Sequence, residues 1–227
     1  MITTILWDID GTLLDFEKAE SFAIKSLFAE LCLGECSDEM IARYSAINKK
    51  YWERLERGEL SKQQILIGRF ADFFTLEGLD ASLAEIFNSK YQLRLGDTIA
   101  FCDSAYDIVK ALKGRVKQYA VSNGTVAAQT KKLKLSGLQE LFDGVFLSDE
   151  LGAEKPDIEF FKKVFASIEE TDRSKILIVG DSLTSDIQGG NNAEILCCWY
   201  NPKKKIASHK LKIDYEIGNL SEIFDIL

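Results

Sequence analysis

The hydrophobic residues of this chain gather in several short, nearly continuous runs, separated by stretches with helical spacing. Five runs are rich in β-forming residues: Ile2–Trp7, Val116–Val121, Val145–Leu147, Ile176–Val179 and Ile195–Tyr200. A continuous apolar run is typical of a parallel strand that is covered on both faces. Helices are expected between most of these runs, at Ser104–Leu112, Thr125–Leu135, Ile158–Ser167 and Ser185–Asn191. The alternation predicts an α/β fold with a doubly wound parallel sheet.

A long segment between the first and second predicted strands interrupts this alternation. Residues 16–95 contain no convincing strand run, and their hydrophobic residues recur at helical spacing. Ser37 and Ser61 stand where helix N-caps are expected. We therefore predict a core domain of residues 1–15 and 96–227 and an inserted all-helical domain of residues 16–95. Such a domain would lie over the carboxyl ends of the strands, where ligands bind in this architecture.

Two carboxylates stand two positions apart at the end of the first predicted strand, in the run Asp8-Ile9-Asp10-Gly11-Thr12. Side chains alternate along a strand, so Asp8 and Asp10 would point the same way if the strand continued. Gly11 would let the backbone turn and approach a bound group. Two acids at the end of a buried strand are costly unless a cation or a proton separates them. The run therefore predicts a metal-dependent nucleophile and an acid/base group.

Three further polar clusters lie at the ends of predicted core strands or before a core helix. They are Ser122-Asn123-Gly124, Lys155-Pro156 and the run from Gly180 to Asp186. Because the carboxyl ends of parallel strands meet at one edge of a sheet, we expect all four clusters to converge on one crevice. Each cluster alone is an ordinary turn or helix-start signal. Their occurrence together, in this order, predicts an active site.

The residue types in these clusters suit the transfer of a phosphoryl group. Asp8 can attack an electrophilic phosphorus and form an aspartyl-phosphate. Asp8, Asp181 and a backbone carbonyl are oxygen ligands of the kind that Mg²⁺ accepts, and Asp186 fits as a supporting metal group. Asp10 is free to protonate the leaving alkoxide and then to deprotonate the attacking water.

Phosphate binding is expected from the groups around these carboxylates. The Ser122 hydroxyl and the adjacent backbone amides, at Asn123 and Gly124, can hold phosphoryl oxygens, and we count Thr12 among the substrate-binding residues. The Lys155 ammonium would offset negative charge on the phosphate and on the nucleophile.

Composition and charge narrow the class of partner. The chain has 227 residues and a formal net charge of −8, which argues against a nucleic-acid duplex as the main partner. A small anionic substrate remains compatible with this charge, because a divalent cation and local groups dominate inside a site. We see no membrane-spanning run and no secretory signal, so we expect a cytoplasmic protein, as a monomer or small homo-oligomer, that does not bind membranes. The single histidine, His209, lies in a polar tail, so chemistry that needs a catalytic histidine is poorly supported.

The four clusters resemble the signature motifs of the haloacid dehalogenase superfamily of hydrolases. The resemblance covers the whole chain, including a helical cap domain after the first motif, and it implies a Rossmann-like core and Mg²⁺-dependent phosphoryl transfer. It implies the following roles: Asp8 as nucleophile, Asp10 as acid/base, Ser122 as phosphate binder, Lys155 as charge anchor, and a metal held by Asp8, the Asp10 carbonyl and Asp181.

Two stretches of the helical segment, Asn48-Lys49-Lys50-Tyr51-Trp52 and Gly68-Arg69-Phe70, are similar to those of cytosolic 5′-nucleotidases that act on pyrimidine nucleoside monophosphates. The resemblance implies that Trp52 stacks on a base and that Arg69 binds phosphate or sugar oxygens. Packing between helices is the alternative for Trp52.

The leading prediction is a Mg²⁺-dependent phosphohydrolase of small phosphate monoesters, with nucleoside 5′-monophosphates as the favoured substrates. A phosphosugar mutase or sugar-phosphate phosphatase would use the same four clusters. A dehalogenase would need neither the metal nor an acid for an alkoxide leaving group. A binding protein that has lost catalysis is opposed by the intact acids and by Lys155.

Overall fold

A computed structural model of the chain describes residues 1–207 and 210–227, so the prediction for His209 lies outside the described residues. The chain forms two compact units, which we call the core unit (Met1–Phe16 and Ile99–Leu227) and the helical unit (Glu17–Thr98). The sequence-based boundaries fall after residue 15 and before residue 96.

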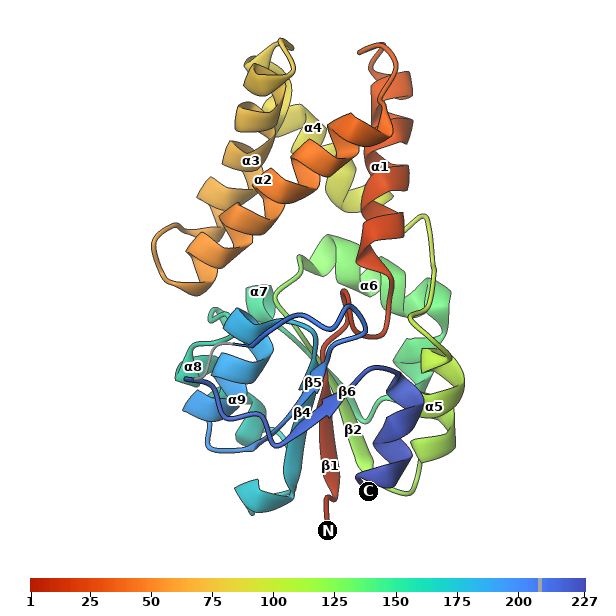
Figure 1. The fold of residues 1–227 in the computed structure, drawn as a ribbon, viewed down its shortest axis with the longest axis vertical. Coiled ribbons are helices and arrows are strands. Elements are labelled where there is room, and N and C mark those ends of the chain that lie inside the picture. Colours follow the sequence, from red (N-terminus) through yellow and green to blue (C-terminus); the bar gives the residue numbers. More distant parts are fainter. Residues whose placement is uncertain (208–209) are drawn as a thin grey trace. The chain divides into compact units, whose positions relative to one another are not determined.

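The core unit is built on one six-stranded sheet with the order β3-β2-β1-β4-β5-β6 (Figure 1), and all neighbouring strands are parallel. The strands are β1 (Thr4–Trp7), β2 (Lys117–Ser122), β3 (Gly144–Leu147), β4 (Ile176–Gly180), β5 (Leu196–Tyr200) and β6 (Tyr215–Ile217). The first five lie at the five predicted runs. The strand order reverses about β1, which places a ligand crevice at the carboxyl ends of β1 and its two neighbours. The predicted doubly wound α/β fold is confirmed.

The short edge strand β6 is absent from the sequence-based prediction. It has three residues and pairs with β5, with Cys198 opposite Tyr215. No long apolar run marks it. However, Ile213, Tyr215 and Ile217 alternate with polar residues and precede Gly218, and this pattern is a strand signal that could have revealed it.

Helices cover both faces of the sheet (Figure 1). On one face α5 (Ala105–Leu112) and α6 (Val126–Ser136) pack on the side chains of Ile5 and Trp7. On the other face α8 (Ile158–Phe165) and the short π-helix Leu183–Ile187, which leads into α9 (Gln188–Asn192), pack on Leu6 and Ile178. Residues of one strand thus enter two different cores, which is why the strands are apolar without alternation. Trp7 and Trp199, which lie in two of the predicted strand runs, are buried.

The helical unit consists of α1 (Phe16–Glu30), α2 (Asp38–Glu56), α3 (Lys62–Leu76) and α4 (Ala84–Arg94), with α1 beginning one residue before the unit. Ser37 and Ser61 cap α2 and α3 as predicted, each accepting a hydrogen bond from the backbone N–H three residues on. Aromatic rings fill the interior; Tyr44 and Phe70 stack with their ring centroids 4.9 Å apart. The other buried rings are Phe28, Phe73, Phe74, Phe87 and Tyr91.

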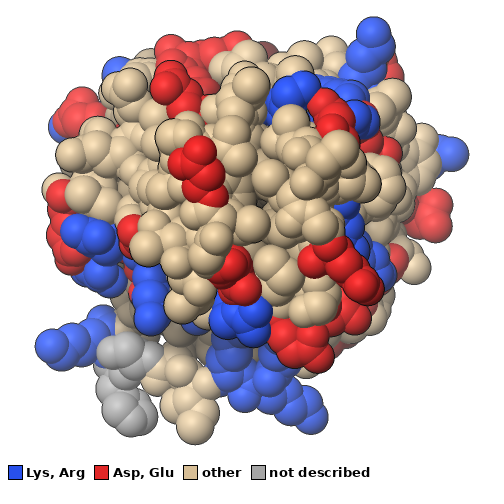
Figure 2. All heavy atoms as spheres, turned by 90° about the horizontal axis from the view of Figure 1, so that it is seen from above, with Lys and Arg blue, Asp and Glu red and all other residues tan. Residues whose placement is uncertain are grey.

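Charged side chains of both signs share the surface. On the face drawn in Figure 2, Lys and Arg side chains are interspersed with Asp and Glu side chains. Several form exposed ion pairs, such as Lys25–Asp38 at 2.5 Å and Arg94–Glu30 at 2.7 Å, and such pairs contribute little to stability. Among the described residues, no helix combines the length and the hydropathy that crossing a membrane requires.

Candidate active site

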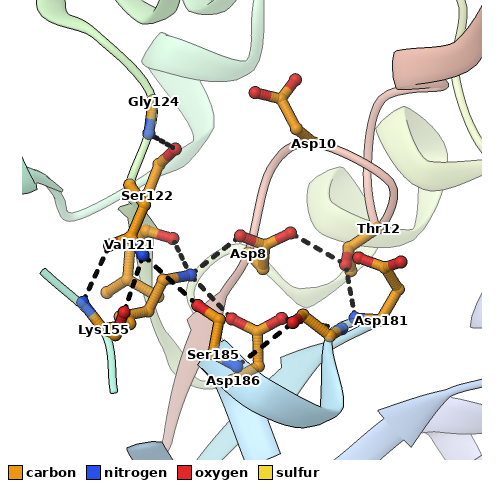
Figure 3. Close-up of polar contacts among 12 residues, drawn as sticks. Asp8, Asp10, Thr12, Val121, Ser122, Gly124, Lys155, Asp181, Ser185 and Asp186 are labelled. Carbon is orange, nitrogen blue, oxygen red and sulfur yellow. Dashed lines mark hydrogen bonds and ion pairs between the residues drawn. The ribbon is translucent and has the colours of Figure 1, made fainter. Parts of the chain in front are cut away.

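The sheet brings the predicted clusters to its carboxyl edge (Figure 3). Asp8 follows the last residue of β1, Ser122 is the last residue of β2, and Asp181 follows the last residue of β4. Lys155 lies in the loop between α7 (Ser148–Leu151) and α8. The alignment of β1 with both neighbours, in which Trp7 pairs with Ala120 and with Val179, sets these strand ends level with one another.

The Lys155 ammonium is the centre of the polar network. Its Nζ lies 2.8 Å from Asp8 Oδ1 and 2.7 Å from Asp186 Oδ1, and it donates a third hydrogen bond to the Val121 carbonyl at 2.9 Å. The side chain is 1% exposed. Burial alone would lower the pKa of Lys155, but the carboxylates of Asp186 and Asp8 outweigh it and raise the pKa above its ordinary value. The ammonium is therefore a fixed positive charge beside Asp8.

Thr12 ties Asp8 to the end of β4. Its hydroxyl donates to Asp8 Oδ2 and accepts from the Asp181 backbone N–H, both at 3.0 Å. With Lys155 on Oδ1 and Thr12 on Oδ2, the Asp8 carboxylate is held at both oxygens. The predicted substrate-binding role of Thr12 stays a prediction; its two protein contacts favour a role in orienting Asp8.

Three carboxylates, those of Asp8, Asp181 and Asp186, have ligand oxygens within 4.8 Å of one another. Burial, then the Asp186 carboxylate, raises the pKa of Asp8 well above its ordinary value. The same two causes raise the pKa of Asp181 to about 6. Lys155 supplies one positive charge against three negative ones, so a divalent cation would balance the cluster and favour the ionised acids. The all-oxygen donor set suits Mg²⁺.

The loop after Asp8 leaves space for the Asp181 carboxylate. Gly11 has a φ of +91°, and a Cβ at this position would lie 2.8 Å from Asp181 Oδ1. A side chain at residue 11 would therefore both strain the turn and displace a candidate metal ligand.

Asp10 lies apart from the three clustered carboxylates. β1 ends at Trp7, so Asp8 and Asp10 do not share a direction, and the Asp10 carboxylate points away from Asp8 (Figure 3). Its oxygens contact α6 instead: Gln129 Nε2 donates to Oδ2 at 2.5 Å, and Lys132 Nζ lies 2.5 Å from Oδ1. With the side chain so engaged, only the backbone carbonyl of Asp10 suits the metal role that the resemblance implies.

Gln129 and Lys132 are site residues that the sequence analysis missed. Both lie on α6 three residues apart, and both are buried at positions in register with Leu133 and Ser136. Polar residues within the buried stripe of a core helix are an available signal, because such groups are buried only where they find partners.

The Ser122-Asn123-Gly124 turn uses its polar groups largely within the protein. The Ser122 hydroxyl accepts from the Gly124 N–H at 3.0 Å and keeps its own proton to donate. The Asn123 side chain donates to the Lys155 carbonyl and accepts from the Lys155 N–H, each at 2.8 Å. These contacts favour a supporting role for the Asn123 side chain, and phosphate binding by this turn stays a prediction.

The two predicted substrate residues of the helical unit, Trp52 and Arg69, differ in their exposure to solvent. Trp52 is partly exposed on α2, which leaves its predicted stacking role open. Arg69 on α3 is 1% exposed; its guanidinium donates to Asn48 Oδ1 at 2.7 Å and to Asn88 Oδ1 at 3.1 Å. Asn48 in turn donates to Glu20 Oε1 at 2.9 Å. The predicted substrate contact of Arg69 stays untested, but its burial favours a structural role inside the helical unit.

Comparison with known proteins places these observations in a family. A family model described as haloacid dehalogenase-like hydrolase matches residues 2–194. The chain is 35% identical over 224 residues to the HAD-hydrolase YfnB of Bacillus subtilis, covering 99% of this chain and 94% of the relative. It is 35% identical to the pyrimidine 5′-nucleotidase PynA of Streptococcus pneumoniae, covering 98% and 94%. It is 26% identical to the pyrimidine 5′-nucleotidase YjjG of Escherichia coli, covering 98% and 96%.

A solved structure resembles the chain along its whole length. The crystal structure of Bacillus subtilis YfnB bound to magnesium matches with a TM-score of 0.94 at 34% identity, covering 100% of this chain and 98% of the other. The similar fold and the magnesium in that protein agree with the oxygen-rich cluster at the carboxyl edge of this sheet.

Proposed function

Because the chain belongs to the haloacid dehalogenase-like hydrolases, we propose that it is a Mg²⁺-dependent phosphohydrolase that acts on pyrimidine nucleoside 5′-monophosphates through an aspartyl-phosphate on Asp8. The observation that carries the proposal is the Asp8 carboxylate, held between Lys155 and Thr12 within a cluster of three acids. Two relatives named as pyrimidine 5′-nucleotidases support the substrate class.

In the first step of the proposed reaction, an Asp8 carboxylate oxygen forms a bond to phosphorus as the bond from phosphorus to the ester oxygen breaks. Asp10 gives the leaving 5′-oxygen the proton that it took from water in the preceding turnover. Lys155 stays beside Asp8 and offsets the negative charge that gathers there. Ser122 has a free hydroxyl proton with which to hold a phosphoryl oxygen.

In the second step a water attacks phosphorus, and Asp10 takes the proton that this water loses. The bond between Asp8 and phosphorus breaks, which restores Asp8 and releases inorganic phosphate. Asp8, Asp181 and the Asp10 carbonyl would hold Mg²⁺, with Asp186 supporting them. When bound, Mg²⁺ supplies positive charge that offsets the repulsion between the acids and the phosphate.

The test is phosphate release from a panel of esters in the presence of Mg²⁺. The panel contains pyrimidine nucleotides (uridine, cytidine and thymidine 5′-monophosphates), purine nucleotides, and ribose and glucose phosphates. We expect kcat/KM to be about tenfold or more higher for the pyrimidine nucleotides than for the purine nucleotides and sugar phosphates. The Asp8→Asn variant is the control for contaminating phosphatases.

Three outcomes would count against the proposal. Release from none of the esters would refute hydrolysis of phosphate monoesters. A preference for ribose or glucose phosphates would replace the nucleotide substrate with a sugar phosphate. Conversion of one sugar phosphate to another without release of phosphate would identify a mutase.

A further inference from the structure

Two side chains of helix α6 contact the Asp10 carboxylate. Gln129 Nε2 and Lys132 Nζ approach its two different oxygens, each at 2.5 Å. Lys132 is 2% exposed and Asp10 is 23% exposed, so the pair is sheltered rather than lying on the surface. The ammonium also lies 5.4 Å from the centroid of the Phe16 ring, which covers it. A lysine buried in this way is held to one position, unlike a solvated one.

The turn after β2 leaves space for the Gln129 amide that contacts Asp10. A Cβ at Gly124 would lie 2.0 Å from Gln129 Nε2 and 2.8 Å from its Cδ. The glycine of the Ser-Asn-Gly turn therefore makes room for the amide that reaches Asp10. Gln129 itself is fully buried.

The direction of the Asp10 carboxylate agrees with its proposed task. In an in-line displacement the leaving oxygen lies on the far side of phosphorus from the attacking Asp8. The acid that protonates it must therefore lie a phosphoryl group away from the nucleophile. Asp10 points away from Asp8 (Figure 3), and α6 holds it there through two contacts. Fixed orientation of this kind is what makes a general acid effective.

We propose that Lys132, together with Gln129, is a positioning residue that holds the Asp10 carboxylate where it serves the leaving oxygen and, later, the attacking water. This assignment rests on the proposed function, in which Asp10 is the acid/base. Lys132 acts through Asp10 and not through the phosphate. Its loss should therefore slow the steps that need proton transfer and should spare a step that needs none.

The test compares two leaving groups in Lys132→Met, which keeps an unbranched side chain, one atom shorter, and removes its charge. Departure of p-nitrophenolate needs little help from an acid, whereas departure of a nucleoside 5′-alkoxide needs it. In stopped flow, with enzyme and Mg²⁺, Lys132→Met should release a burst of p-nitrophenol at close to the wild-type rate. Its later turnover should be slower by about 10- to 100-fold, because attack of water still needs Asp10.

With uridine 5′-monophosphate, rapid quench should find formation of the aspartyl-phosphate itself slowed by about 10- to 100-fold in Lys132→Met, with KM changed little. Lys132→Arg, which keeps a charged donor, should recover part of the rate. Lys134→Met is the matched control, because Lys134 is exposed on the same helix, and it should behave as the wild type. A further measurement checks that the site around Asp8 is intact in Lys132→Met. Beryllofluoride with Mg²⁺ should bind to Asp8 and raise the melting temperature of the variant as it does that of the wild type.

The outcomes separate this assignment from the proposed function. The assignment would be overturned if a folded Lys132→Met slowed the p-nitrophenol burst as much as it slowed formation of the aspartyl-phosphate from uridine 5′-monophosphate. A matching rise in KM for both substrates at unchanged kcat would also overturn it, since that pattern describes a phosphate-binding residue. In either case an active wild type leaves the proposed function standing. A wild type that releases phosphate from neither ester would refute the proposed function, and the assignment with it.

Discussion

The buried acid of the helical unit, Glu20, gives a stability prediction with a defined sign. Glu20 is 2% exposed, accepts hydrogen bonds from Ser45 and Asn48, and is separated from Arg69 by the Asn48 side chain. Burial raises the pKa of its carboxyl from 4.5 to about 7, although both hydrogen bonds and the Arg69 charge oppose this. The folded protein therefore keeps a proton on Glu20 over a range of pH in which the unfolded chain has lost it.

The consequence is a free energy of unfolding that falls as the pH rises from 4.5 to about 7. The difference between the two pKa values corresponds to about 3 kcal/mol of stability. Protonation of Glu20 contributes this free energy below pH 4.5, and the contribution is lost as the pH rises above about 7. Glu20→Gln carries no titrating proton. Its free energy of unfolding, relative to that of the wild type, should therefore rise by about 3 kcal/mol between pH 4.5 and about pH 8.

Urea denaturation at several pH values measures this difference. Trp52 is the only tryptophan within residues 17–98 and provides a fluorescence signal from the helical unit. Comparing the pH dependence, rather than the absolute stability, cancels any hydrogen bond that the glutamine loses and every other titrating group. Glu85→Gln, an exposed acid on α4, is the control and should run parallel to the wild type. The reasoning would be refuted if the free energy of unfolding of Glu20→Gln also changed with pH in parallel with that of the wild type.

Three further predictions concern the core unit. Asp8→Asn should lower turnover about a thousandfold or more while thermal unfolding without metal stays cooperative, since the change removes one of three crowded carboxylates; retained activity would remove Asp8 as nucleophile. Excess chelator should stop phosphate release, and added Mg²⁺ should restore it; an unchanged rate would contradict the metal role. Gly124→Ala should lower kcat because its Cβ would displace the Gln129 amide, 2.0 Å away; wild-type kcat would show that the contact with Asp10 is dispensable.

Much of this structure follows from local patterns in the sequence. The five apolar runs predict the first five strands, because a parallel strand that is buried on both faces has to be apolar throughout. The convergence of Asp8, Ser122 and Asp181 then follows from sheet topology, since parallel strands end at the same edge. Ser37 and Ser61 locate two helix starts because a cap depends only on neighbouring residues.

What the sequence does not predict depends on contacts between distant residues. The helical spacing of α6 does not say that Lys132 meets Asp10, because that contact joins a helix to a loop 122 positions away. Burial of Arg69 likewise requires Asn48 from α2 and Asn88 from α4, each supplying a carbonyl oxygen. A charged side chain enters a core only when such partners are present, and a single helix does not reveal them.

The paired hydrogen bonds between the Asn123 side chain and the backbone of Lys155 have an evolutionary consequence. They imitate the exchange between two neighbouring strands, yet they need only one amide side chain and one peptide unit. Both backbone polar groups of Lys155 therefore depend on one amide side chain, and the next residue is also held, since the Pro156 carbonyl accepts from Asn192 Nδ2 at 2.9 Å. A substitution that removed the Asn123 amide would leave a buried donor and a buried acceptor unpaired at once, so lineages are expected to vary little at this position.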